Sequence, residues 1–179
     1  MDPEAAIPPE VLELAEACVR YVRRSTGVPL DYSQDTLGVL DHYARSIRGE
    51  PRDEILALLV PAIGAYFGEV VRREIGGRWQ LVDPGDWTTH RLVVDELGLS
   101  FNPTAIALEC VTGEPGAEVG SALRFPEEHR DLVASALDAA GPVTDDDYDR
   151  LAVRFEAIQQ VVSVLTGILA SRRTVRDEP

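Results

Sequence analysis

The residues with the clearest potential for chemistry lie in one short stretch, where a glutamate is followed by two arginines and a tryptophan. Glu69 precedes Arg72 and Arg73 by three and four positions, and Trp79 comes shortly after them. At this spacing on a helix the carboxylate can form ion pairs with both arginines, each worth about 0.2–0.5 kcal/mol. Burial without a cation would instead raise its pKa, which is the condition for a general acid or base. The ion pair is the favoured interpretation, and the acid or base is its alternative.

Two further side chains extend the alternative site. Trp87 and His90 follow Trp79 in a segment rich in turn residues. With Glu69 and Arg73 they could line a polar ligand pocket, whereas tryptophans are otherwise typical core anchors. These five residues therefore form the candidate ligand-binding site, and no residue is designated as catalytic.

Metal and nucleophile chemistry have little support elsewhere in the chain. The histidines at 42, 90 and 129 are never paired four positions apart, so a zinc site would need three distant elements to converge. The aspartates at 145, 146, 147 and 149 lack the glycine at the bend of a helical-loop calcium site, so helix capping is their favoured role. Cys18 and Cys110 have no histidine near them in sequence and are expected to be buried, reduced thiols. Neither a metal nor a cofactor is therefore expected.

The net charge narrows the class of partner. The 179 residues include 17 arginines, no lysine and 31 acids, which gives a formal net charge of −14. A protein that binds a nucleic-acid backbone or an anionic membrane needs a basic surface, so neither partner is expected. Residues 83–149 hold 15 acids and three arginines, a local balance of −12. Such a region would attract a basic protein surface, although keeping the protein soluble is its simpler role.

A hydrophobic helix is expected to position Glu69. The segment 52–75 is apolar on more than one face, which predicts a helix at the centre of the fold. Pro61 inside it predicts either a kink or a junction of two helices. Gly64 and Gly68 lie four residues apart, which allows another backbone to approach that side closely.

The residue pattern in the middle of the chain is typical of a small β-sheet. Short runs over 78–82, 89–95 and 99–101 are separated by turn residues, which predicts two or three antiparallel strands. The next segment, 103–112, reads as a helix or a strand. An exposed loop is expected over 112–125, and loops of that length tend to be functional.

Further helices are predicted on both sides of this region. Apolar stripes predict one over 10–25 and a second that starts at Ser33 as its N-cap. Another begins at Pro126, and a last helix of about 28 residues is expected from Thr144, with the following aspartates filling its first turn. This last helix could also provide the seam of a homodimer.

One stretch resembles a group of uncharacterised bacterial proteins. The string from Gly64 to Trp79 carries Gly68, Glu69 and a double glycine, and it leads from a helix into a strand that begins at the tryptophan. The preceding residues 30–37 resemble the way those proteins open an earlier helix. This resemblance covers roughly residues 30–80 and implies a domain of unknown function, with no activity to carry over.

Together these patterns predict an α+β fold that is mostly helical, with about six helices around the central helix and a small antiparallel sheet. A single domain is expected over 1–179, divided into helical residues 8–77, a sheet and loop over 78–125, and C-terminal helices over 126–173. The acidic N-terminus and the lack of an apolar run approaching the roughly 18–20 residues of a membrane span predict a cytoplasmic protein.

Two functions are consistent with these patterns. The preferred one is a non-enzymatic, acidic protein-interaction module that binds a basic protein, of which an immunity-like protein is one version. The alternative is a small-molecule-binding protein or enzyme whose polar pocket lies near Glu69, Arg73, Trp79 and His90.

Overall fold

The fold is α+β and mostly helical, as predicted. The computed structural model describes residues 7–48, 53–114, 123–142 and 144–176. Within these residues there are six helices of at least ten residues, one short helix and a three-stranded antiparallel sheet. The helices are α1 (Pro9–Thr26), α2 (Leu37–Ser46), α3 (Asp53–Ile75), α4 (Pro103–Thr112), α5 (Arg130–Ala139), α6 (Asp145–Tyr148) and α7 (Leu151–Arg176). The strands are β1 (Arg78–Gln80), β2 (Arg91–Val94) and β3 (Leu99–Phe101).

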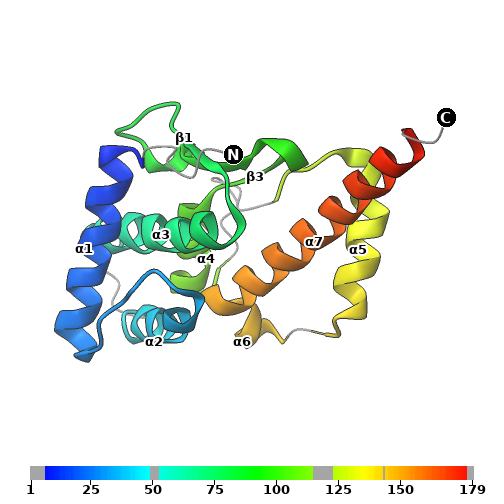
Figure 1. Ribbon diagram of the computed structural model, residues 1–179. Coiled ribbons are helices and arrows are strands. Elements are labelled where there is room, and N and C mark those ends of the chain that lie inside the picture. Colours follow the sequence, from blue (N-terminus) through cyan, green and yellow to red (C-terminus); the bar gives the residue numbers. More distant parts are fainter. Residues whose placement is uncertain (1–6, 49–52, 115–122, 143, 177–179) are drawn as a thin grey trace.

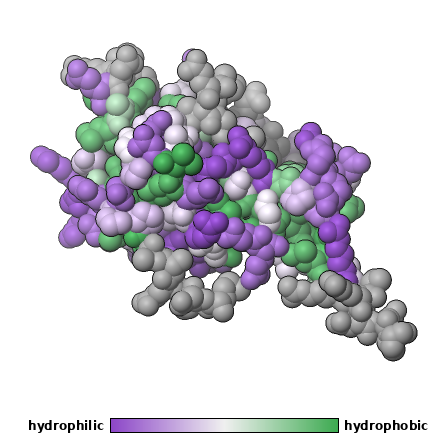
Figure 2. Space-filling model, turned by 90° about the horizontal axis from the view of Figure 1, so that it is seen from above, coloured by the Kyte–Doolittle hydropathy of each residue, from purple (hydrophilic) through white to green (hydrophobic). Residues whose placement is uncertain are grey.

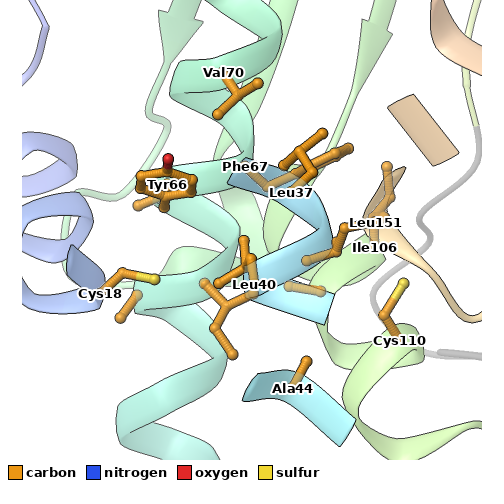
Figure 3. Packing of buried hydrophobic residues seen from close by; sticks show 14 of the residues in the cluster. Cys18, Leu37, Leu40, Ala44, Tyr66, Phe67, Val70, Ile106, Cys110 and Leu151 are labelled. Carbon is orange, nitrogen blue, oxygen red and sulfur yellow. The ribbon is translucent and has the colours of Figure 1, made fainter. Parts of the chain in front are cut away.

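Helix α3 is the central element, which confirms the prediction from its apolar composition. It passes between α1 and α4 (Figure 1) and continues through Pro61 without a break in the helix. Its apolar side chains meet those of α1, α2, α4 and α7 in one cluster (Figure 3). The cluster includes Cys18, Leu37, Leu40, Tyr66, Phe67, Ile106 and Leu151.

Both glycines of α3 mark close contacts. A Cβ on Gly64 would overlap the Cα of Thr104 in α4, and one on Gly68 would overlap the indole ring of Trp79. The glycine spacing therefore correctly predicted a close approach on this side of the helix. One neighbour is a helix backbone and the other is a tryptophan side chain.

The two cysteines are buried, as expected. Cys18 in α1 and Cys110 in α4 are both free thiols within the core. Burial disfavours the charged thiolate, so it raises the pKa of both groups, that of Cys110 to about 12. The thiolate is the nucleophile and metal ligand, so neither side chain is poised for such chemistry.

The sheet has a core face and an outer face. Strand order is β1-β2-β3, with Trp79 opposite Leu92 and Leu92 opposite Phe101 on the side that packs against α3 and α4. Side chains alternate along a strand, so the residues between them point away from the core. An isolated bridge between Ser100 and Arg124 adds one more chain segment beside β3.

The segment 103–112, for which the sequence allowed a helix or a strand, is helix α4. Asn102 decides this locally, because its side-chain oxygen accepts hydrogen bonds from the amides of Thr104 at 2.9 Å and Ala105 at 3.1 Å. Pro103 then occupies the first turn, where a missing amide hydrogen costs nothing. Most of the predicted loop after α4, residues 115–122, lies outside the described residues.

Two predicted helix starts are wrong in detail. Ser33 does not cap α2 with its hydroxyl. That hydroxyl donates to Asp31 at 2.6 Å, and a short 3₁₀ turn, η1 (Gln34–Thr36), precedes the helix. The last helix does not begin near Thr144, because α6 ends at Tyr148 and α7 starts afresh at Leu151.

A residue distant in sequence caps α7. The buried Asp41 of α2 accepts hydrogen bonds from the amides of Leu151 at 2.6 Å and Ala152 at 3.2 Å. A cap supplied from another helix satisfies amides that would otherwise be left unpaired, and it ties the two helices together. The aspartates at 145–147, predicted to fill the first turn of the last helix, lie instead in the separate helix α6.

Replacement of Asp41 by asparagine is expected to produce a stability difference that depends on pH. Burial, only partly offset by the two backbone hydrogen bonds, raises the pKa of Asp41 in the folded protein. A raised pKa contributes stability that is fully present below the unfolded value, near 3.9, and is lost as the pH rises through the folded value. The advantage of the wild type over Asp41→Asn should therefore narrow as the pH rises above about 4 in urea unfolding curves. The exposed Asp35→Asn is the control, and a difference that is constant with pH would contradict the argument.

Two helices are long and apolar enough to cross a membrane by length and composition alone, a test that the buried core helix of a globular protein also passes. They cover Glu54–Ile75 and Leu151–Arg172. For α3 this is explained by the fold, because 72% of its apolar window is buried inside the protein. For α7 the buried share is 33%, since its second half leaves the helical body and runs beside α5 (Figure 1). Hydrophobic side chains also reach the surface at that end of the molecule (Figure 2).

Candidate functional site

The carboxylate of Glu69 is enclosed and fully engaged. The residue is 1% exposed, on the side of α3 that faces β1. Arg72 donates from Nε to Oε1 at 2.9 Å and from Nη2 to Oε2 at 3.1 Å, which makes a bidentate pair. The indole Nε1 of Trp79 donates to Oε1 at 2.7 Å. Burial therefore comes with a cation and a further donor, and a substrate would have to displace these contacts to reach the carboxylate.

The predicted ion pairs form with unequal strength. Arg72, three residues on, makes the short bidentate contact, while Nε of Arg73 lies 3.9 Å from Oε2 of Glu69. Arg73 is 42% exposed, compared with 14% for Arg72, so the inner arginine balances most of the buried charge. Spacing correctly identified both partners.

Arg73 belongs to an aromatic stack that no local sequence pattern indicated. Its guanidinium carbon lies 4.0 Å from the centre of the Tyr32 ring, a cation–π contact, and that ring stacks on Tyr66 at 4.8 Å. Tyr32 has a positive φ of 65°, and its amide donates to the hydroxyl of Tyr66 at 2.9 Å. The hydroxyl of Thr36 forms a hydrogen bond with the same Tyr66 hydroxyl at 2.8 Å. These contacts attach the segment before α2 to Arg73. Together with Glu69, Arg72 and Trp79, Arg73 forms a group that we call the Glu69 cluster.

The remaining candidate residues lie in the connection between β1 and β2. Trp87 is half-buried in the 3₁₀ turn η2 (Trp87–Thr89), and its carbonyl accepts from the amide of His90 at 3.2 Å. The His90 ring is buried, with Nε2 at 3.2 Å from the carbonyl oxygen of Asp83. Of the five candidates, Glu69, Arg73 and Trp79 are joined by a hydrogen bond and an ion pair. Trp87 and His90 instead hold the turn between β1 and β2.

The surface forms a depression elsewhere. A hollow of about 540 Å³ lies between the end of α1 and the outer side of α2. Ser25, Thr26, His42 and Ser46 contribute its polar lining, and none of the five candidate residues takes part. The ligand pocket predicted around Glu69 stays a prediction, and its carboxylate is not the floor of this hollow.

A second buried ion pair joins α4 to α7. Arg154 donates from Nη2 to Oε2 of Glu109 at 2.8 Å and from Nε to the carbonyl of Tyr148 at 2.8 Å. Its guanidinium also lies 3.4 Å from the centre of the Tyr148 ring. Arg48 also links α4 to the segment before α7, because it donates to the carbonyl of Cys110 at 2.8 Å and to Asp149 at 2.9 Å.

Comparison with known proteins gives no identity. No family model, curated protein or solved structure matches the chain. Within the described residues there is also no group of three or more histidine, cysteine or acidic side chains that could hold a metal ion. The function therefore has to be argued from the geometry of the chain itself.

Proposed function

We propose that this protein is a non-enzymatic, cytoplasmic protein-interaction module that binds a basic protein through the solvent face of α5. The observation that carries the proposal is that α5 displays acids around an exposed leucine, while the best candidate for a reactive carboxylate is enclosed. Glu69 has three hydrogen bonds from Arg72 and Trp79, so a substrate would have to displace them to reach it.

Helix α5 has one face for the protein and one for solvent. Val133 is buried against α7, and the carbonyl of Ala136 accepts from Gln160 of α7 at 2.6 Å. The opposite face exposes Asp131 and Asp138, which lie seven residues apart and so share one side of the helix. Glu128 lies just before the helix, where its Oε1 is 3.8 Å from Nη2 of Arg172 in α7. We call these three acids the α5 acidic surface.

An apolar group lies beside these acids. Leu132 is 56% exposed, although a leucine of this size gains about 1.5–3 kcal/mol from full burial. Interfaces commonly combine a few apolar anchors with a charged rim that accelerates encounter. The partner class that fits is a basic protein surface with an apolar recess for Leu132.

The proposal is tested by capture of a partner from native lysate with two matched variants. The triple variant Glu128→Gln, Asp131→Asn and Asp138→Asn should lose the main partner by at least tenfold. The control triple, Glu10→Gln, Glu13→Gln and Glu16→Gln, removes the same charge from α1 and should retain it. At about 0.5 M salt the screening length is only about 4 Å, so capture by the wild type should also fall.

Equal capture by the two triple variants would overturn this assignment of the surface. A partner retained at high salt by all three proteins would show that charge does not select it. In either case α5 would lose its proposed role.

A second candidate function is self-assembly through α7, favoured by the low burial of its apolar window. Residues 157–171 contain no charged side chain in a chain with a net charge of −14, so two copies can meet here with little repulsion. Acids before α7 and arginines at its end favour an antiparallel pairing. Light scattering should then give a dimer mass that Gly167→Arg, at a site with nothing within 4 Å, reduces to a monomer. A wild-type monomer at all concentrations would contradict it.

A further inference from the structure

The outer face of the sheet carries an arrangement of arginines that neither the interaction surface nor the Glu69 cluster uses. Cross-strand partners place Arg78, Val93, Ser100 and Arg124 in one row, because each is paired with the next across the sheet. Arg91 lies two residues from Val93 on β2 and so faces the same side. Three arginines thus share one face of a small sheet in an acidic protein.

The arginines on this face differ in their partners. Arg78 is held by Asp95, with Nε 2.6 Å from Oδ2 and Nη2 2.9 Å from Oδ1. Arg91 is half-buried, and its Nε and Nη2 atoms are inaccessible to solvent without a hydrogen-bond partner among the residues that the structure describes. Arg124 is exposed, and the ion pairs found in the described parts of the chain do not include it.

An unpaired buried donor on a charged group is costly. Such a group loses its hydration without gaining an acceptor, which destabilises the folded state. Burial lowers the pKa of the Arg91 guanidinium, and the positive charge of Arg124 lowers it further. The protein therefore holds two like charges near each other, a repulsion that an anion bound between them would relieve.

We propose that Arg91 and Arg124 form a binding site for a phosphate group on the outer face of the sheet. Phosphate supplies several acceptor oxygens, and the planar guanidinium of the exposed Arg124 matches their geometry in bidentate contacts, while Arg91, whose Nε and Nη2 are buried, contributes mainly its positive charge. It also carries a charge of about −1.5 to −2 at neutral pH, which balances two guanidinium groups where one carboxylate balances only one. Gln80, opposite Arg91 on β1, and Ser100, opposite Arg124, place further hydrogen-bonding side chains on the same face.

Calorimetric titration of the full chain with inorganic phosphate and with a simple phosphate monoester tests this site. Acetate at matched ionic strength serves as the monoanion control. We expect saturable binding of at least one phosphate compound, and the tighter of the two distinguishes free phosphate from a phosphorylated ligand. Arg91→Gln and Arg124→Gln should each weaken that binding by tenfold or more. The control is Arg130→Gln, because Arg130 is exposed at the start of α5, away from the sheet, and pairs with Glu127 in the turn just before that helix. This variant should bind as the wild type does.

The binding test gives a clear result even if one of the two arginine variants folds poorly. Arg124 is exposed, so Arg124→Gln should keep the unfolding temperature of the wild type, and Arg91→Gln removes donors for which the described residues supply no acceptor. The proposal is overturned if neither phosphate compound binds, if acetate binds as tightly as the better of the two, or if both variants bind that compound with wild-type affinity. None of these outcomes depends on the α5 acidic surface, so the two proposals stand or fall separately.

Discussion

Replacement of Glu69 by glutamine is expected to lower the free energy of unfolding by about 3 kcal/mol. Removal of one partner from a buried ion pair typically costs about 3–5 kcal/mol, because the other charge is left uncompensated. Glutamine retains an oxygen for the indole of Trp79, so the loss should lie near the lower end. Arg72, with a side chain only 14% exposed, would lose its bidentate acceptor and could not regain full hydration. Urea unfolding followed by circular dichroism measures the change.

Two variants separate this effect from a general change in charge. Glu74→Gln removes the same charge from an exposed position on α3 and should change stability by less than about 0.5 kcal/mol. Arg72→Met in the Glu69→Gln background removes the stranded cation and should restore part of the loss. Full stability of Glu69→Gln would show that the carboxylate is not structural. The alternative ligand site near Trp79 would then become the better explanation of its burial.

The sequence was most informative where partners lie close together in the chain. The three-residue and four-residue steps from Glu69 identified Arg72 and Arg73, since helix geometry fixes which side chains meet. The stripes of apolar residues located α1 and α3 for the same reason, and turn residues delimited the three short strands. The Tyr32 contact with Arg73 carried no such signal, because it joins a loop to a helix residue far along the chain.

Long-range polar contacts explain most of what the sequence did not predict. Asp41 caps a helix that starts 110 residues later, and Arg154 pairs with a glutamate 45 residues earlier. Neither spacing has a local periodicity, so both contacts are decided by tertiary packing. The break before α7 has the same cause. The first amides of α7 donate to the carboxylate of Asp41, so they are satisfied without a continuous helix from α6.

The outer sheet face shows a related limit. Alternation along β2 places Arg91 and the apolar Leu92 on opposite faces, which a period of two makes visible in the sequence. The register between strands and the bridge from Ser100 to Arg124 are needed before the arginines can be seen to share a face. The net charge of residues 83–149 is strongly negative, so it does not reveal the basic face of the sheet. Two of the three arginines on that face, Arg91 and Arg124, lie within this acidic region.

Replacement of Gly64 by alanine is expected to destabilise the protein by about 3 kcal/mol, even though alanine favours a helix by about 1 kcal/mol over glycine. The added Cβ would lie 2.6 Å from Oγ1 of Thr104 and would overlap its Cα, which belongs to the backbone of α4. A flexible side chain could move aside, but α4 is anchored by Asn102 at its start and by the core along its length. The helices must separate, and the loss of contacts between α3 and α4 outweighs the gain in helix propensity.

The same substitution at open positions should have the opposite sign. A Cβ on Gly38 in α2 or on Gly167 in α7 would have nothing within 4 Å, so alanine there should raise the free energy of unfolding by up to about 1 kcal/mol. Thermal and urea unfolding of the three variants compare them directly. If Gly64→Ala were as stable as Gly38→Ala, α3 and α4 would have to be farther apart than the structure places them. The close packing around Glu69 would then be wrong as well, because Gly68, which contacts the indole of Trp79, lies one helical turn after Gly64 on the same side of α3.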